Sequence, residues 1–188
     1  MNTTGTVLLV GGVILAGYLY GQKKNTSTVR QEPGSPPPSR PSPASPVYSG
    51  RVLSRQQKAM ADLIIDKAES FGINPAFMIA LAVTESSLSA STVGDDGLSV
   101  GLFQLNKRFI QASDAELLDP DFNAEASMEK MNLLMRSFPG HTYGDYAEAW
   151  ALGGAGRFKK GRRFPAKLTN MQQAINDLNL HLSLTERA

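Results

Sequence analysis

A single glutamate, Glu85, closes a strongly apolar segment of the sequence, and a glycine-rich segment, residues 94–106, follows it. A carboxyl group at the end of a buried helix is partly withheld from water, and such desolvation favours its protonated form. A carboxylic acid that keeps its proton near neutral pH can protonate a glycosidic oxygen and afterwards take a proton back. The sequence therefore indicates general acid and base catalysis of glycoside cleavage by Glu85.

The segment 94–106 carries groups that suit a polymer lying close to the backbone. Its glycines permit conformations that are closed to other residues. Ser99 and Gln104 offer neutral hydrogen-bonding groups that match sugar hydroxyl and N-acetyl groups, and Asp95 supplies a second carboxylate near the start of the segment. By composition alone, the segment could equally be an ordinary turn, and Glu85 a solvated glutamate.

Helices predicted from apolar periodicity must position Glu85 and the segment 94–106. One helix ends at Gly72, and Asn74 and Pro75 read as the N-cap and first residue of the next. That next helix, from Pro75 to about Glu85, is apolar nearly all round and should be buried. Apolar periodicity predicts further helices around 128–138 and 145–152. Two capping signals, a capping box at Ser113–Glu116 and a cap at 169–172, each predict the start of another helix. Since no segment alternates as a strand, the domain is predicted to be mostly α-helical.

Two short motifs resemble the signature of soluble lytic transglycosylases and the related goose-type lysozymes. They are Thr84 to Ser87 and Gly101 to Leu105. The similarity extends over residues 94–108, in the goose-type form of this loop, and covers most of residues 55–155. The resemblance implies a mostly α-helical, lysozyme-like fold that cleaves the glycan strands of peptidoglycan.

The resemblance also implies roles for individual residues. By position, Glu85 becomes the general acid and base, and Asp95 matches a carboxylate that positions water in goose-type enzymes. The substrate-binding candidates are Ser99, Phe103, Gln104 and Trp150. Trp150 can stack on a sugar face, but a core aromatic explains it equally well.

Two departures from the family pattern bear on this assignment. Goose-type loops often carry a further aspartate where this chain has Asn106, and the third motif has Tyr-Asn where this chain has Trp150 and Ala151. The departures leave open a protein of another class, a non-catalytic, wall-binding structural membrane protein that has kept the fold. The intact Glu85 argues against that alternative.

The second carboxylate decides which reaction follows. With one glutamate, the substrate's N-acetyl group assists departure of the leaving sugar. The muramic C6 hydroxyl then attacks the anomeric carbon and gives a 1,6-anhydro product. With a second carboxylate about 6.5–9.5 Å away, water attacks instead. We expect the lytic transglycosylase reaction, with a goose-type muramidase as the alternative.

The N-terminal third of the chain differs in composition from the rest. Residues 1–22 are predicted to be a transmembrane helix, because 5–21 hold no charged residue and would span roughly 25 Å as a helix. Residues 23–50 are rich in proline and serine and predict a disordered linker, so residues 51–188 form the expected domain. This arrangement predicts a single-pass protein of a phage membrane or bacterial inner membrane, with the lipid bilayer and other virion or envelope proteins as partners.

Composition narrows the remaining possibilities. The chain has no cysteine and two distant histidines, so neither a metal nor another cofactor is expected. Residues 1–50 hold four basic and one acidic residue, which leaves 15 basic and 16 acidic residues for 51–188. Such a balance does not favour nucleic acid as a partner. Six cations between Arg157 and Lys167 are expected to be a solvated segment, or one attracted to anionic wall polymers.

Overall fold

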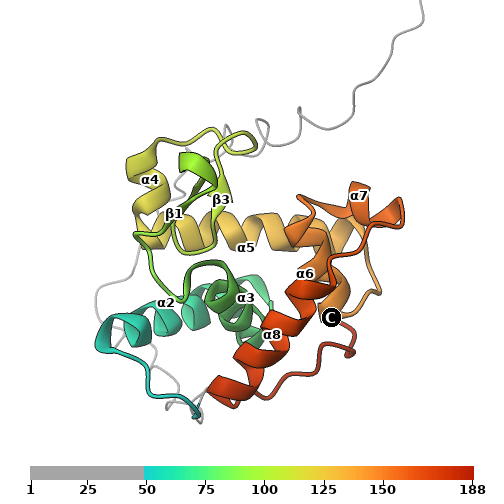
Figure 1. The fold of residues 1–188 in the computed structure, drawn as a ribbon, viewed down its shortest axis with the longest axis horizontal. Coiled ribbons are helices and arrows are strands. Elements are labelled where there is room, and N and C mark those ends of the chain that lie inside the picture. The colour runs from blue at the N-terminus through green and yellow to red at the C-terminus, as the bar shows by residue number, and fades with distance from the viewer. Residues whose placement is uncertain (1–48) are drawn as a thin grey trace, which may run out of the picture.

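The computed structural model describes residues 49–188 (Figure 1). The helices are α2 (Arg55–Phe71), α3 (Pro75–Ser86), α4 (Asp114–Leu118), α5 (Pro120–Ser137), α6 (Tyr143–Ala151), α7 (Ala155–Lys159) and α8 (Pro165–Leu178). Between α3 and α4 lie the strands β1 (Val93–Gly94), β2 (Ser99–Val100) and β3 (Leu105–Asn106), with a short 3-10 turn, η1 (Asp95–Gly97). The prediction of a mostly α-helical domain is confirmed.

The predicted N-terminal elements lie outside the described residues. This applies to the transmembrane helix at 1–22 and to nearly all of the linker at 23–50. Within residues 49–188, none of the helices has both the length and the apolar character needed to cross a bilayer.

The first two helices begin and end where the sequence predicts. Gly72 ends α2 in the left-handed conformation, with φ of 67°, which glycine adopts without steric cost. The side chain of Asn74 then caps α3 by accepting a hydrogen bond from the backbone N–H of Ala76 at 2.9 Å. Pro75 occupies the first turn, where its missing N–H leaves no helical hydrogen bond unmade.

Helix α3 is the centre of the domain. Every residue from Ala76 to Ala82 is buried, because α2 packs on one side of the helix and α8 on another. Figure 1 shows α8 running beside α3, although the two helices are far apart in the sequence. An apolar helix surrounded in this way holds its last turn, and therefore Glu85, in a fixed place.

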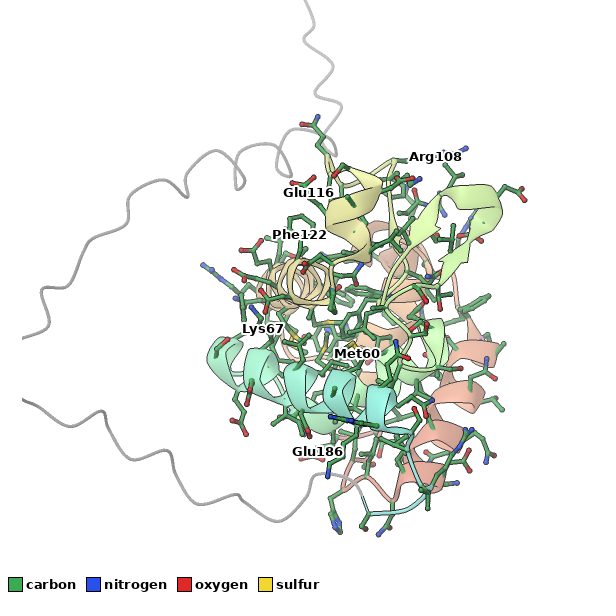
Figure 2. All side chains as sticks on the ribbon, turned by 90° about the vertical axis from the view of Figure 1, so that its left-hand side faces the viewer. Met60, Lys67, Arg108, Glu116, Phe122 and Glu186 are labelled. Atoms are coloured by element: carbon green, nitrogen blue, oxygen red, sulfur yellow. The ribbon has the colours of Figure 1, made fainter. Side chains whose placement is uncertain are left out.

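The long helix α5 packs against α2 and closes the core on that side. An ion-pair cluster at the surface joins the two helices. Lys67 points from α2 toward α5 (Figure 2), and its ammonium lies 3.0 Å from an Asp121 oxygen and 3.1 Å from a Glu125 oxygen. The two carboxylates raise the pKa of Lys67, although desolvation, the largest single effect, acts in the opposite direction.

A small antiparallel sheet, which the sequence pattern did not predict, lies between α3 and α4. Val93 pairs with Val100, and Val100 pairs with Leu105, so β2 is the middle strand. Each strand has only two residues, too few for alternation to be recognised in a sequence. Figure 1 shows this sheet and α4 together at one end of the domain.

The prediction for the last helix was wrong at its start. Helix α8 begins at Pro165, and Thr169 and Asn170, expected in the cap, lie inside it. Proline is favoured in a first helical turn, so Pro165 is the better start signal. At its other end, the backbone N–H groups of Ser49 and Gly50 donate to the carbonyl oxygen of Leu178 at 3.0 and 3.1 Å.

Candidate active site

Glu85 lies in the last turn of α3, and its side chain is 19% exposed. Its oxygen Oε1 accepts a hydrogen bond of 2.7 Å from Nζ of Lys167 on α8. The same ammonium also bonds the hydroxyl of Thr84. The candidate acid is therefore held by a cation from the neighbouring helix, while its other oxygen, Oε2, has no hydrogen bond to a described residue.

The position of Lys167 corrects the interpretation of the cationic segment. The five other cations, Arg157 to Arg163, are exposed, but Lys167 is only 5% exposed. Burial lowers the pKa of Lys167, and the adjacent Glu85 acts in the opposite direction. Lys167 is thus part of the site and does not belong to a solvated segment.

A second lysine, Lys130 of α5, is close enough to Glu85 for their charges to interact. Its ammonium lies 3.8 Å from the centroid of the Trp150 ring, in a cation–π arrangement. Desolvation lowers the pKa of Lys130 to about 8, against the opposing influence of Glu85. Glu85 therefore interacts with two cations from two helices, with Lys167 through a hydrogen bond and with Lys130 through its charge.

Trp150 and Phe103 form the apolar wall beside these charges. Their ring centroids are 6.3 Å apart in an edge-to-face arrangement. Phe103 is fully buried and Trp150 is 5% exposed. Phe103 therefore supports Trp150 from within the core, and the Trp150 face under the Lys130 ammonium is not open to a sugar ring.

The two sequence motifs are joined by a buried hydrogen bond. The hydroxyl of Ser86, the residue after the candidate acid, donates to the carbonyl oxygen of Leu102 at 2.7 Å. It also accepts from the N–H of Ser89 at 3.2 Å. The end of α3 is thereby held against the glycine-rich segment, as expected if the two motifs form one site.

Gln104 serves the loop's own structure. Its side-chain nitrogen donates to the carbonyl oxygens of Thr92 and Gly101, at 3.0 and 2.9 Å. Its backbone is left-handed, with φ of 48°, which the two hydrogen bonds help to stabilise. The side-chain amide of Gln104, predicted to bind sugar, thus already uses its nitrogen within the loop.

The side chain of Asn123 on α5 holds the loop from below. It is fully buried, accepts from the N–H of Phe103 at 2.9 Å, and donates to the carbonyl oxygens of Val100 and Leu117 at 3.0 and 2.8 Å. Three backbone groups that would otherwise be buried without partners are satisfied by one amide. Gly101 makes this approach possible, because a Cβ there would lie 2.3 Å from the Asn123 side-chain nitrogen.

Asp95 and Ser99 interact with each other. The Ser99 hydroxyl donates to Oδ2 of Asp95 at 2.5 Å across the β1–β2 hairpin. Asp95 and Asp96 are exposed, and both have left-handed backbones. Neither makes a hydrogen bond with Glu85 among the contacts of the described residues. The oxygen of Asn106, at one departure from the family pattern, accepts from the N–H of Arg108 and so shapes the loop locally.

Glu148 has a part in the site that the sequence did not reveal. Its carboxylate is buried, accepts from the N–H of Phe164 at 2.7 Å, and lies 3.9 Å from the Arg163 guanidinium. Since Phe164 directly precedes α8, Glu148 fixes the start of the helix that brings Lys167 to Glu85.

Sequence reasoning also missed the two lysines, although a signal for them exists. Lys167 shares an inward stripe of α8 with Met171, Ala174 and Leu178, all buried. Lys130 follows Asn123 and Ser127 at the spacing of the buried stripe of α5. A lysine at a core-facing position is unusual unless its ammonium has a function or a partner. Within residues 49–188, no three His, Asp or Glu side chains are arranged to hold a metal ion.

Comparison with known families agrees with this geometry. The profile of the transglycosylase SLT domain matches residues 62–170, more than half of the chain. The chain belongs to the transglycosylase SLT domain family. Membership supports a glycan-cleaving activity of the transglycosylase or lysozyme type, with peptidoglycan as the substrate. No curated protein sequence matches the chain.

Proposed function

We propose that the protein is a peptidoglycan lytic transglycosylase in which Glu85 is both general acid and general base. The bond cleaved is the β-1,4 bond from N-acetylmuramic acid to N-acetylglucosamine. The observation that carries the proposal is the placement of Glu85 on the buried helix α3, joined to the glycine-rich loop through Ser86 and Leu102. A rigid acid at the edge of a loop suited to a glycan is what this cleavage needs.

The hydrogen bond from Lys167 occupies only one oxygen of Glu85, so the other oxygen can donate a proton to the glycosidic bond. Oε1 of Glu85 accepts from the ammonium, while Oε2 carries the proton that passes to the glycosidic oxygen. The N-acetyl oxygen of the muramoyl residue then bonds to C1 as the leaving sugar departs. In the second step, Glu85 takes the proton from the C6 hydroxyl, whose oxygen attacks C1, expels the N-acetyl oxygen and closes the 1,6-anhydro ring.

The surroundings of Glu85 favour this route over hydrolysis. An inverting hydrolase needs a second carboxylate to activate water. The candidate, Asp95, is exposed and accepts its short hydrogen bond from Ser99. The muramidase is nonetheless the second candidate, because Asp95 occupies the position that goose-type enzymes use.

Digestion of purified peptidoglycan by the full-length chain tests the proposal. Mass analysis should find product ends lighter by one water than reducing ends, and Glu85→Gln should produce none. Ordinary reducing ends would instead support the muramidase. Binding of the wall without any cleavage would support the non-catalytic, structural alternative.

We also propose that residues 5–21 anchor the protein in a membrane, and that the domain opens the wall locally during phage infection or lysis. The support is the uncharged stretch and the proline-rich segment after it. Fractionation of cells that express the full chain or residues 51–188 tests the anchor. Only the full chain should sediment with membranes. If the full chain and residues 51–188 are equally soluble, the proposed anchor is wrong.

A further inference from the structure

Lys130 is a desolvated cation whose ammonium donates no hydrogen bond to any of the described residues. An ammonium group can donate three hydrogen bonds. Among residues 49–188, its recorded contact is the face of Trp150, at 3.8 Å, and no side-chain or backbone oxygen accepts from it. Burial of an unpaired cation is costly, and the lowered pKa of Lys130, about 8, is the effect of that desolvation.

The charges around Glu85 do not balance. Lys167 donates directly to Glu85, so one cation already accompanies this carboxyl group. Lys130 adds a second positive charge, which interacts with the same carboxyl group without forming an ion pair with it. Two cations thus accompany one carboxyl group, so these three side chains carry at least one unbalanced positive charge at neutral pH, whether or not Glu85 holds its proton, and an anionic group on the bound substrate would balance it.

The proposed substrate carries such groups. Each muramoyl residue has a lactyl ether that ends in a carboxylate when no peptide is attached, and stem peptides bring carboxylates of their own. A neutral N-acetylglucosamine polymer has none. A lysine ammonium is a compact charge that can follow a carboxylate in several orientations. Lys130 interacts with the charge of the candidate acid and contacts Trp150, whose ring packs on Phe103 of the glycine-rich loop, so it belongs to the region where a muramoyl residue would bind.

We propose that Lys130 binds a carboxylate of the glycan strand and thereby makes the enzyme select muramoyl glycans that carry free carboxylates. The inference rests on the proposed function and adds a specificity residue to it. When the carboxylate binds, Lys130 gains an acceptor, which residues 49–188 do not provide.

Paired substrates test the inference. Peptide-free glycan strands, with free lactyl carboxylates, are compared with the same strands after conversion of those groups to methylamides. At pH 6.5, the full-length protein should cleave the carboxylate strands about ten-fold faster, in kcat/KM, than the amidated strands. Lys130→Met should reduce this ratio to about one, and Lys130→Arg, which keeps the charge, should retain most of it. Lys160→Met, an exposed lysine after α7, is the matched control and should leave the ratio unchanged.

A binding measurement separates this inference from the proposed function. The disaccharide GlcNAc-β-1,4-MurNAc lacks the bond to be cleaved, so its affinity can be measured by calorimetry without turnover. Stronger binding of the free acid than of its methylamide, lost in Lys130→Met, supports the carboxylate site even if no strand is cut. Equal binding of both by the wild type, or an unchanged preference in Lys130→Met, overturns the inference while cleavage of peptidoglycan still supports the function.

Discussion

The hydroxyl of Ser86 donates a 2.7 Å hydrogen bond to the carbonyl oxygen of Leu102. This contact joins the residue after the candidate acid to the middle of the glycine-rich loop, sixteen positions further along the chain. It gives a physical reason for the two motifs to occur together. Together with Asn123 below the loop, the serine helps to set the position of the loop relative to Glu85.

Ser86→Ala should therefore lower both stability and activity. The carbonyl oxygen of Leu102 would be left without its donor, at a cost of about 1–3 kcal/mol in the free energy of unfolding. Urea denaturation measures this loss, and peptidoglycan digestion should be slowed at temperatures where the variant is still folded. Ser91→Ala, at an exposed position, is the control. If both variants behave like the wild type, the hydrogen bond does not position the loop.

Glu85→Gln should abolish cleavage and keep the fold, with some loss of stability because the buried Lys167 loses the charge of its partner. A general acid contributes typically about 10²- to 10⁴-fold to a rate, and a glutamine has nearly the same shape. Turbidity loss of a peptidoglycan suspension measures activity, and circular dichroism checks the fold. Glu69→Gln, at an exposed position on α2, should remain fully active. Retained cleavage by Glu85→Gln would show that another group supplies the proton.

Gly101→Ala should destabilise the domain by more than about 2 kcal/mol. The backbone there is left-handed, with φ of 82°, and a Cβ would lie 2.2 Å from the carbonyl oxygen of Leu117. Gly156→Ala is the contrasting change, because it lies in α7 with open space around it. It should be neutral or stabilise by up to about 1 kcal/mol. Thermal melts of the two variants check this difference, and similar melting temperatures would contradict it.

Lys130→Met should raise the free energy of unfolding at pH 7 by about 1–2 kcal/mol. The pKa of Lys130 in the folded protein, about 8, lies below its ordinary value of 10.5. Between these two values the unfolded chain holds a proton that the folded protein lacks, so stability rises with pH. The penalty is complete below pH 8 and is relieved as the pH approaches 10.5.

Denaturant titrations at pH 7 and pH 10 measure this effect as a difference between the wild type and Lys130→Met. The gap between the two proteins should shrink as the pH rises. Lys160→Met, which changes an exposed lysine, should show no such trend. A constant gap for Lys130→Met would mean that its ammonium is well solvated in the folded protein.

Much of the helical frame was predictable because its signals are local. Gly72, Asn74 and the capping box at Ser113 act within one helical turn, and each is found where the sequence indicates. The start of α8 was missed because a plausible cap at Thr169 competed with the first-turn proline at Pro165. The two-residue strands gave no periodic signal at all.

The site was only partly predictable, since its remaining contacts are long-range. Glu85 and the loop were recognised from their motifs, but the partner of Glu85, Lys167, lies 82 positions away. Its charge suggested a solvated segment, whereas the apolar stripe of α8 brings it inside. Phe103 and Gln104 were assigned to sugar binding, yet the structure shows the first buried and the second bonded within the loop.

The contact between residues 49–51 and the end of α8 has a mechanical consequence. The backbone of Ser49 and Gly50 bonds Leu178, and a Cβ on Gly50 would lie 2.3 Å from the carbonyl oxygen of Asp177. Tension on the chain before residue 49 would therefore reach α8 first. Helix α8 also carries Lys167, which donates a hydrogen bond to Glu85. A pulling force at this attachment point therefore acts on the helix that supplies the partner of the candidate acid.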